Sequence, residues 1–499
     1  MYILYIGNKT YCFSQTSMLS LSYTDWLGKS MLITVKDCIC GHGKTLGMVK
    51  QIKEMYKKNA NEVFLYITPY LEQCHDVAGT EPIDGDEYKR PKRDKHNAVI
   101  YSPSDNNLGC MYFKHPNNNN SLGAKQEGLK TLMSNKDHIV STHNLFLNMK
   151  LDTLQNADQY TLIIDECLDV FDKYALLPEK EVKKLLKLNI LHLQEDGISL
   201  SFNRKKFGDM CNLSDGEDAV ADTRYEELAV LCDNNQILLV NGSVLLWEFS
   251  AEILKKFKKV FILSYLFEGR EMSVYLKKHK LEYEIVKEGK KGSDIAHLVE
   301  VLDDSKLNSI GSGYFDLSIS RTRTNRPKRY EPNINDFKGD EVKYKASVKR
   351  YESYLNSVNV SELQAHEVND TLRKNLHSVF TTRWKAKAND RYFTCLSENK
   401  ALIGGKNYHN NWLGYSTKAV NSFSDTHHVA FLMNVFIQPY IKQVCDGTDF
   451  VVDEDLVSLS HLVQFVFRSA LRKGEAIKVY IPSSRMRELF KDYLRGVYE

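Results

Sequence analysis

A glycine-containing loop between a strand pattern and a helix pattern constrains the fold of this chain more than any other feature. The loop consists of Gly41, His42, Gly43, Lys44 and Thr45. The apolar run 31–35 before it predicts a buried strand, and apolar residues recur at three-residue steps from Leu46 to Met55 after it, as on one face of a helix. This order of strand, glycine loop and helix restricts the segment to an α/β unit with the loop at the carboxyl end of the strand.

The residue types in this loop are those that hold a phosphate group. Glycines let backbone N–H groups close around a phosphate, and the helix N-terminus adds its partial positive charge. Lys44 is expected to reach the β- and γ-phosphates, and the Thr45 hydroxyl is expected to bind Mg²⁺. The strict pattern has glycine where this chain has Cys38. An incidental Gly-Lys-Thr is the alternative, but the strand before it and the helix after it favour a phosphate-binding loop.

A second acidic motif supports this interpretation. The apolar run 160–164 predicts a strand, and the paired carboxylates Asp165 and Glu166 follow it directly. Asp165 is expected to hold the Mg²⁺ ion, and Glu166 is placed to orient and deprotonate an attacking water. The alternative is a helix N-terminus whose two acids complement the helix dipole. Because the motif follows the loop on a plausible neighbouring strand, it favours a site for nucleotide hydrolysis.

Strand and helix patterns alternate along the N-terminal half of the chain. Strand candidates lie at 63–67, 138–140, 160–164, 237–240 and 260–263, with helical patterns between them. Alternation of this kind predicts a mostly parallel sheet covered by helices on both faces. The charged segment 178–233 interrupts the alternation and is expected to form a helical insertion.

A second α/β half is expected in the C-terminal part. Residues 286–375 are polar and lysine-rich, and the alternation returns after them. Strands are expected near 377–382 and 476–481, and a helix is expected from about 455 to 472. The two halves are therefore expected to join near residue 290.

The expected helix near the C-terminus carries an unusual polar face. Gln464, Arg468 and Arg472 are four residues apart and so would share one face of that helix. A second domain that presents a fixed arginine to a γ-phosphate accelerates hydrolysis by about 10³- to 10⁵-fold. The alternative is a solvated helix face.

Composition narrows the class of protein. Lys+Arg 67 against Asp+Glu 64 gives a net charge of +3, so an anionic partner would have to meet local patches. The longest apolar runs are far shorter than the ~18 to 20 residues that span a bilayer, and no basic, apolar and small-residue signal opens the chain. Ten cysteines match no zinc spacing. We expect a soluble intracellular protein without a membrane partner or a structural metal.

Several motifs together resemble the superfamily 2 DExx-box helicases, in particular those encoded in bacteriophage replication regions. Residues 41–45 are similar to motif I, 67–73 to motif Ia, 165–168 to motif II, 262–267 to motif III, 415–421 to motif V and 464–472 to motif VI, and 141–145 are similar to the Thr-His segment before motif II. The block from 428–434 through 481–487 resembles the C-terminal block of the phage proteins.

The resemblance implies an α/β fold of two RecA-like parallel-sheet domains in tandem. Residues 1–290 would form the first domain, with a helical or irregular insertion at about 178–233. Residues 291–375 would form a polar basic connection, and residues 376–499 the second domain.

The resemblance also implies roles for individual residues. Those for nucleotide binding are Gly41, His42, Gly43, Lys44, Thr45 and Gln464. Those for nucleic-acid binding are Thr68, Pro69, Thr142, His143, Thr417 and Lys418. The catalytic group comprises Lys44, Glu166, Arg468 and Arg472, and Thr45 and Asp165 hold the metal. Motif VI lacks its glycine and its second arginine falls one residue late, so either arginine is a candidate for the finger.

The implied activity is an ATP-dependent helicase or translocase acting in phage replication or recombination. Its cofactors would be ATP and Mg²⁺, and its partners single-stranded or forked DNA, with RNA as an alternative, and replication or recombination proteins. The expected location is the cytoplasm, that of the host cell for a phage protein. The alternatives are a packaging-type or nuclease-partner translocating ATPase without strand separation, and a nucleotide-binding scaffold that does not hydrolyse.

Overall fold

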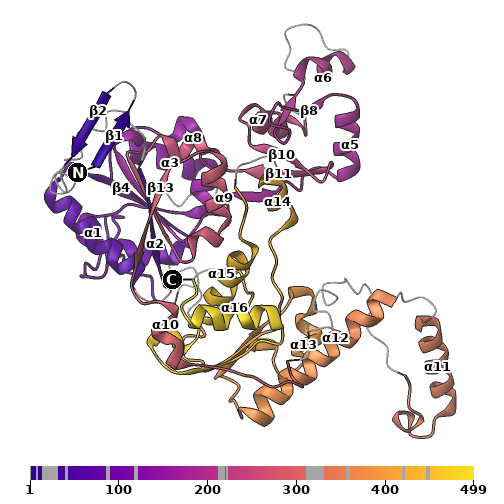
Figure 1. Ribbon diagram of the computed structural model, residues 1–499. Coiled ribbons are helices and arrows are strands. Elements are labelled where there is room, and N and C mark those ends of the chain that lie inside the picture. Colours follow the sequence, from indigo (N-terminus) through magenta and orange to yellow (C-terminus); the bar gives the residue numbers. More distant parts are fainter. Residues whose placement is uncertain are drawn as a thin grey trace.

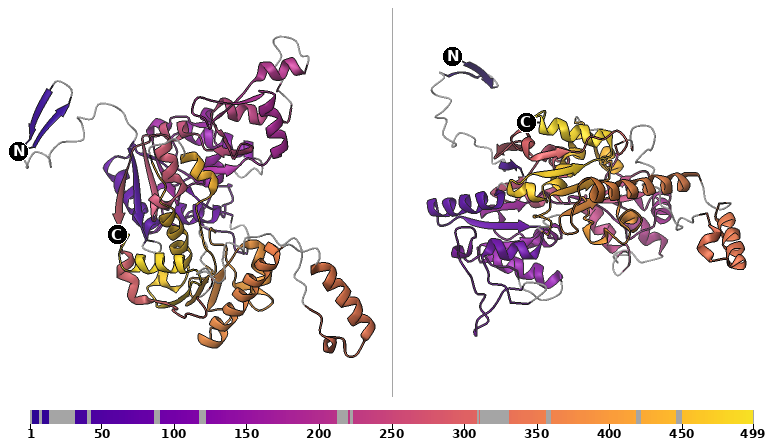
Figure 2. Two further views of the ribbon diagram at one scale, coloured as in Figure 1. Left: turned by 45° about the vertical axis from the view of Figure 1, so that its right-hand side comes forward. Right: turned by 90° about the horizontal axis from the view of Figure 1, so that it is seen from below.

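The computed structural model describes most of the chain and shows two parallel sheets with their helices (Figures 1 and 2). The described residues are 2–6, 9–13, 32–39, 43–85, 90–116, 122–211, 220, 223–308, 310, 331–355, 360–417, 422–445 and 450–498. The N-terminal hairpin consists of β1 (Tyr2–Ile6) and β2 (Lys9–Phe13), which pair antiparallel.

The first large sheet has six parallel strands in the order β13-β3-β12-β6-β4-β5. The strands are β3 (Leu32–Cys38), β4 (Val63–Thr68), β5 (Ile139–Thr142), β6 (Tyr160–Asp165), β12 (Lys259–Ser264) and β13 (Tyr283–Glu288). Every residue of β4 and β6 is buried, which explains their continuous apolar runs, because helices cover both faces of this sheet.

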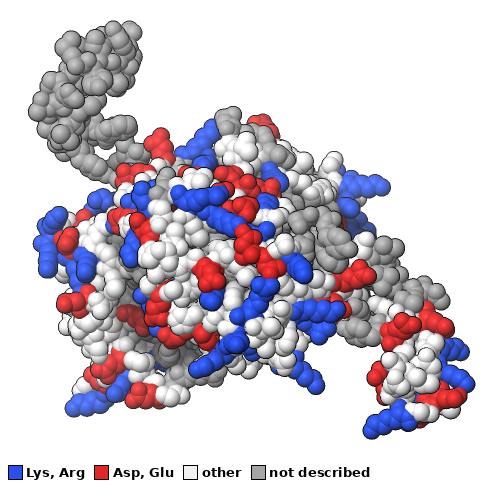
Figure 3. Space-filling model, turned by 60° about the horizontal axis from the view of Figure 1, so that its bottom comes forward, with Lys and Arg blue, Asp and Glu red and all other residues white. Residues whose placement is uncertain are grey.

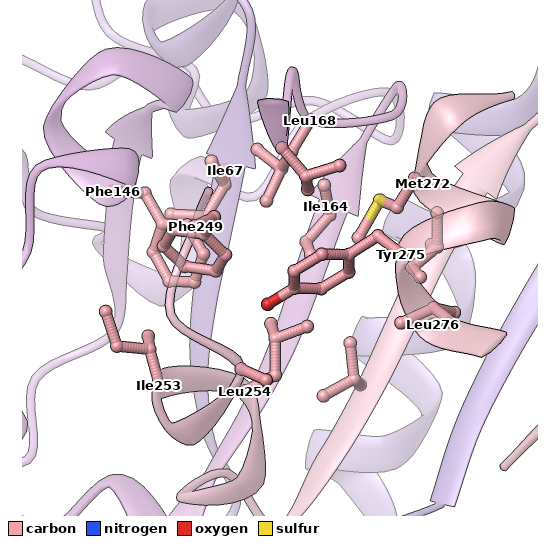
Figure 4. Packing of buried hydrophobic residues seen from close by; sticks show 14 of the residues in the cluster. Ile67, Phe146, Ile164, Leu168, Phe249, Ile253, Leu254, Met272, Tyr275 and Leu276 are labelled. Carbon is pink, nitrogen blue, oxygen red and sulfur yellow. The ribbon is translucent and has the colours of Figure 1, made fainter. Parts of the chain in front are cut away.

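Helices from different parts of the chain cover the two faces of the first sheet. They are α1 (Lys44–Lys58), α2 (Leu71–Ala78), α3 (Leu122–Ser134), α4 (His143–Leu147), α8 (Ala251–Lys255) and α9 (Glu271–Lys278). Phe64 and Ile163 pack with α1 and α2, whereas Leu65 and Ile164 pack with the other four helices. Figure 4 shows this second core, in which Ile164 lies among side chains of α4, α8 and α9. The alternation of neighbouring residues between two cores follows from the two-residue period of a strand.

The second large sheet has four parallel strands in the order β14-β17-β16-β15. The strands are β14 (Val299–Val301), β15 (Arg391–Thr394), β16 (His428–Phe431) and β17 (Ile477–Tyr480). One face packs on α15 (Glu454–Val466) and α16 (Ser484–Leu494), and the other packs on α12 (Val360–His377) and α13 (Lys400–Gly404). The chain therefore has two RecA-like parallel-sheet domains in tandem, and β14 comes from the segment expected to connect them.

The insertion expected at about 178–233 is larger, about 171–248, and contains strands as well as helices. Its helices are α5 (Glu179–Lys187), α6 (Arg204–Met210) and α7 (Glu226–Asp233), and its strands are β7 (Phe171–Lys173), β8 (Leu191–Leu193), β9 (Leu200–Phe202), β10 (Ile237–Val240) and β11 (Val244–Glu248). The strand expected at 237–240 forms but pairs antiparallel within this insertion, so its place in the parallel sheet was predicted wrongly. Helix α14 (Pro439–Cys445) comes from the C-terminal half but lies beside β10 and β11 (Figure 1). There the backbone N–H of Asn241 donates to Gln443 Oε1 and Gln443 Nε2 donates to Asn241 Oδ1, both at 2.7 Å, so the C-terminal half contacts this insertion.

The strand expected near 377–382 is wrong. Helix α12 continues there into a π-helical turn, Ser378–Arg383. Val379 and Phe380 are adjacent and both enter the same core, which a helical turn permits and a strand does not. The β-branched residues that favour a strand in this segment are therefore overridden by packing.

Three further elements lie outside the two sheets: α10 (Gly292–Ile295), the 15-residue helix α11 (Glu341–Leu355), which projects away from the second sheet in Figure 1, and the 3₁₀ turn η7 (Ile334–Phe337). Among the described residues, no helix combines the length and the apolar character needed to cross a bilayer. On the face drawn in Figure 3, Lys and Arg side chains are interspersed with Asp and Glu side chains, which agrees with the small net charge.

Candidate functional site

The loop after β3 leads into α1, whose N-terminus is open to an anion. The N-cap is Gly43, with φ 73°, in the left-handed region that favours glycine. It has no side chain to accept the first-turn N–H groups, and the first turn contains no acidic residue. A 15-residue helix that begins in this way offers N–H groups and a positive dipole end to a phosphate. Gly41 and His42 lie outside the described residues.

The structure brings Thr45 and Asp165 together. The Thr45 hydroxyl donates to Asp165 Oδ2 at 2.9 Å, and the Tyr66 hydroxyl donates to the same oxygen at 3.0 Å. The carboxylate lies at the end of β6 and is only 7% exposed. His143 Nε2 lies 2.9 Å from the backbone oxygen of Asp165, so its ring fixes the end of the strand. Three side chains from three other elements therefore hold Asp165 in place.

The surroundings of Asp165 suit a divalent cation. Burial and the neighbouring Glu166 carboxylate raise the pKa of Asp165, while Thr45, Lys44 and Tyr66 act in the opposite direction. A buried carboxylate of this kind is stabilised in its charged form by a nearby positive charge. The Thr45 hydroxyl and the Asp165 carboxylate are hard oxygen ligands of the type that Mg²⁺ prefers.

The raised pKa of Asp165 predicts a pH dependence of stability. The folded protein retains this proton to higher pH than the unfolded chain, whose ordinary value is 3.8. The free energy of unfolding of the nucleotide-free protein should therefore fall as pH rises from 3.8 through the raised pKa. Asp165→Asn should remove this contribution and leave a shallower fall as pH rises above 3.8, measured by thermal unfolding. Asp152→Asn, at an exposed carboxylate, should keep the wild-type slope. Equal slopes for wild type and Asp165→Asn would contradict the prediction.

Glu166 has a strained backbone and a carboxylate oxygen without a partner. Its φ is 65°, unusual for a residue other than glycine, and its N–H donates to Leu263 O at 3.1 Å. Its Oε2 is buried and has no hydrogen-bond partner among the described residues. Strain of this kind persists where the surroundings hold it, and it is common at functional sites. The Glu166 carboxylate is thus available to accept a proton.

A cavity of about 390 Å³ contains groups from both domains. The first domain contributes Lys44, Glu166, Ser264 and Arg270, and α15 of the second contributes His461 and Gln464. Further lining comes from the segment before α14, including Phe436 and Gln438. Clefts between domains are common places for ligand sites, because movement of one domain changes their shape.

An arginine of the first domain reaches Gln464 across this cavity. Arg270 Nη1 donates to Gln464 Oε1 at 3.2 Å, and its Nη2 donates to Ser460 O at 3.3 Å. The preceding Gly269 lies so close to α15 that a Cβ atom there would be 2.5 Å from Leu456 O. The two domains are therefore in direct contact beside the candidate nucleotide site.

The expectation that Gln464, Arg468 and Arg472 share one helix face is wrong. Helix α15 ends at Val466, and Arg472 is exposed in a 3₁₀ turn, η11 (Ala470–Lys473). After the helix the chain turns, and Ala470 N–H donates to Thr426 O at 2.9 Å. Arg468 is 6% exposed and donates to the backbone oxygen of Thr417. Of the three side chains, only Gln464 lines the cavity.

The residues expected to contact nucleic acid have different environments. Thr68 is fully buried, and its hydroxyl donates to Tyr70 O at 2.9 Å. Pro69 is half-buried. His143 is buried against the backbone of Asp165, and the hydroxyl of Thr142 accepts from Leu145 N–H, so it caps α4. Thr417 is half-buried and contacts Arg468, and Lys418 lies outside the described residues. The side chains of Thr68 and His143 thus contact the protein interior.

Three residues of the site escaped the sequence interpretation. Tyr66 is an interior residue of a buried strand, and no local pattern marks it. Arg270 lies outside every motif. Asp37 accepts hydrogen bonds from Leu266 and Phe267 N–H at 2.8 and 3.2 Å and so holds the loop after β12. An acid at the carboxyl end of a parallel strand is a signal that could have identified Asp37.

Comparisons with known proteins give similarity over most of the chain. Residues 333–494 match the family described as the YonV C-terminal Rossmann-like domain. Over 466 residues the chain is 28% identical to the SPbeta prophage-derived uncharacterized protein YonV of Bacillus subtilis (strain 168), covering 93% of this chain and 99% of that protein. The crystal structure of the Pyrococcus furiosus Hef helicase domain matches with 11% identity and a TM-score of 0.32, covering 91% of this chain and 92% of that chain. The chain is therefore similar in sequence to a prophage-derived protein along nearly its whole length.

Proposed function

We propose that this protein is an ATP-dependent nucleic-acid motor, a DNA helicase or translocase that serves phage replication or recombination. One observation carries the proposal: a single cavity is lined by Lys44 and Glu166 of the first domain and Gln464 of the second, and the next residues along the chain, the half-buried Thr45 and the buried Asp165, are hydrogen-bonded to each other. Lysine, hydroxyl, buried carboxylate and a free carboxylate oxygen are the groups that phosphoryl transfer to water requires.

Each group has a task in the proposed reaction. Lys44 binds the terminal phosphates of ATP, and Thr45 with Asp165 would hold Mg²⁺, which would supply positive charge to the phosphates. Tyr66 keeps the Asp165 carboxylate in one orientation. Glu166 orients a water molecule in line with the γ-phosphate and accepts its proton at Oε2. Burial of this oxygen excludes bulk water from the position where the proton is transferred.

Hydrolysis is coupled to movement through the contact between the domains. Closure around ATP brings α15 toward Lys44 and Glu166, and loss of the γ-phosphate weakens that closed state. The anchor of α14 on the first domain limits this movement to α15 and the second sheet. Because the two domains hold a nucleic-acid strand differently in the open and closed states, the cycle produces steps along that strand.

The contact between Arg270 and Gln464 is expected to transmit this coupling. Arg270→Ala and Gln464→Ala should each reduce the stimulation of ATP turnover by single-stranded DNA about tenfold, and the double variant should lose no more than either one. The readout is steady-state turnover with and without DNA. Arg373→Ala, on the surface of α12, serves as the control and should behave as wild type. Additive losses would contradict a shared role.

Strand displacement tests the proposed activity directly. A forked DNA with a labelled strand is incubated with ATP and Mg²⁺, or with a non-hydrolysable ATP analogue. A helicase releases the strand with ATP only. DNA-stimulated turnover without release would identify a translocase, and neither turnover nor release would contradict the motor.

A further inference from the structure

A second cavity, also of about 390 Å³, lies away from the nucleotide site and between α2 and the edge of the first sheet at β5. Its lining includes His75 from α2 and Val140 from β5, together with Tyr101, Phe113 and His115 from the segment between them. None of these residues takes part in the site described above.

Two histidine nitrogens in this lining have no partner. His75 Nε2 and His115 Nε2 are both buried, and neither makes a hydrogen bond to any described residue. The two rings lie 6.2 Å apart, centroid to centroid, and the side chain of His75 is only 7% exposed. Buried polar atoms are rarely left unpaired, so these two indicate a ligand or ordered water.

The hydrogen bonding of His115 shows whether its Nε2, which has no partner among the described residues, is a donor or an acceptor. His115 Nδ1 lies 2.8 Å from Pro116 O, and a carbonyl only accepts, so Nδ1 carries the proton. Burial lowers the pKa of His115 to about 4, which keeps the ring neutral at physiological pH. His115 Nε2 is therefore a hydrogen-bond acceptor and requires a donor from a ligand. Burial also lowers the pKa of His75.

The other lining residues narrow the chemical class of the ligand. Phe113, Ala78 and Val140 form buried apolar walls, and the exposed side chains of Arg93 and Lys114 also line the cavity. Lys114 is ion-paired with Asp137 at 2.6 Å, whereas Arg93 donates to the backbone oxygen of Asn97 and keeps its charge for an anion. Among its described lining residues, the cavity contains no carboxylate and no thiol. Two imidazoles beside Arg93, without a carboxylate or thiol in the lining, are a poor site for a metal ion or for any cationic ligand. A flat neutral heterocycle with an N–H donor, attached to an anionic group, fits these features.

We propose that this cavity binds a nucleobase with an exocyclic amino group, which donates to His115 Nε2 while Arg93 faces the attached phosphate. The inference that this base belongs to a nucleic-acid strand held by the motor rests on the proposed function. Aromatic and apolar side chains commonly receive an unstacked base in this way.

Cytidine and uridine provide a matched pair of probes. They differ at one position of the ring, where cytidine has an amino group and uridine an oxygen. The full-length protein, with ¹⁵N-labelled histidine rings, is titrated with each nucleoside, and the ring nitrogen shifts are followed by NMR. The exposed His192 serves as an internal reference. We expect cytidine to shift the His115 Nε2 signal and to bind about tenfold more tightly than uridine, as one buried hydrogen bond would give.

Variants test whether the nucleoside binds in this cavity or elsewhere on the protein. His115→Phe keeps a ring of similar size and should abolish the preference for cytidine, and His192→Phe should retain it. His75→Phe offers a second test of the cavity should His115→Phe fail to fold. A cavity filled only with water would show no shift with either nucleoside, and this outcome overturns the proposal, as would equal binding of both. Free nucleosides are used, so an absence of ATP turnover would refute the motor without affecting this result.

Discussion

Lys44→Ala should reduce ATP turnover by about 10²- to 10³-fold while the protein remains folded, the loss typical when one group that stabilises developing charge is removed. Lys44 is the first residue of α1 and lines the cavity shared by both domains. Alanine is a favourable helix residue, so α1 should persist. Steady-state turnover and the melting temperature are measured for the same preparation.

Lys50 provides the matched control for this experiment. It lies on the same helix and is exposed, away from the cavity. Lys50→Ala removes the same charge and should leave turnover unchanged. Wild-type turnover in Lys44→Ala would refute the nucleotide site, and a similar loss in Lys50→Ala would point to an effect of the overall charge of α1.

Glu166→Gln should reduce turnover by about 10²- to 10⁴-fold and leave nucleotide binding intact, because an amide has the shape of the carboxylate but does not accept a proton from water. The substitution preserves the left-handed backbone at φ 65° without adding bulk. Binding of a fluorescent ATP analogue is compared with turnover, since a loss confined to turnover indicates a role in the chemical step.

Asp172 lines the same cavity and provides the control for Glu166. Its carboxylate accepts from the Lys173 N–H and has no place in the proposed reaction. Asp172→Asn should therefore hydrolyse ATP at the wild-type rate. Equal losses in the two variants would show that charge in the cavity, and not proton transfer, controls turnover. Loss of nucleotide binding in Glu166→Gln would show that Glu166 acts in nucleotide binding and not in the chemical step.

Much of the first domain follows from local sequence. The strand before the glycine loop, the helix after it and the acidic strand end are marked by continuous apolar runs and by residues with restricted roles. Thr45 and Asp165 meet because parallel strands present their carboxyl ends at one edge of a sheet. The tandem α/β fold was predictable for the same reason, because alternating strand and helix patterns leave few other architectures.

Features that depend on contacts distant in sequence were not predictable. Beyond the end of α15, the chain is held by a hydrogen bond between Ala470 and Thr426, which lie far apart in sequence. The contacts of Tyr66 with Asp165 and of Arg270 with Gln464 each join segments far apart in the chain. Helical spacing alone therefore placed the two C-terminal arginines on one face, whereas the tertiary structure separates them.

The edge strand of the second sheet was also not predictable from local sequence. Its edge strand β14 has three residues and pairs with β17 from the far end of the chain. A strand this short carries little periodicity of its own, so its place is apparent only from its partner. Likewise, α14 packs on the insertion of the first domain through the amide pair of Gln443 and Asn241, which no sequence pattern marks.

The central claim is that this protein couples ATP hydrolysis to nucleic acid, and turnover with and without single-stranded DNA tests it most directly. We expect DNA to stimulate the wild type strongly, with Glu166→Gln inactive under both conditions. A parallel series with single-stranded RNA measures whether RNA stimulates turnover in place of DNA. Turnover that neither DNA nor RNA changes, or no turnover at all, would contradict the account.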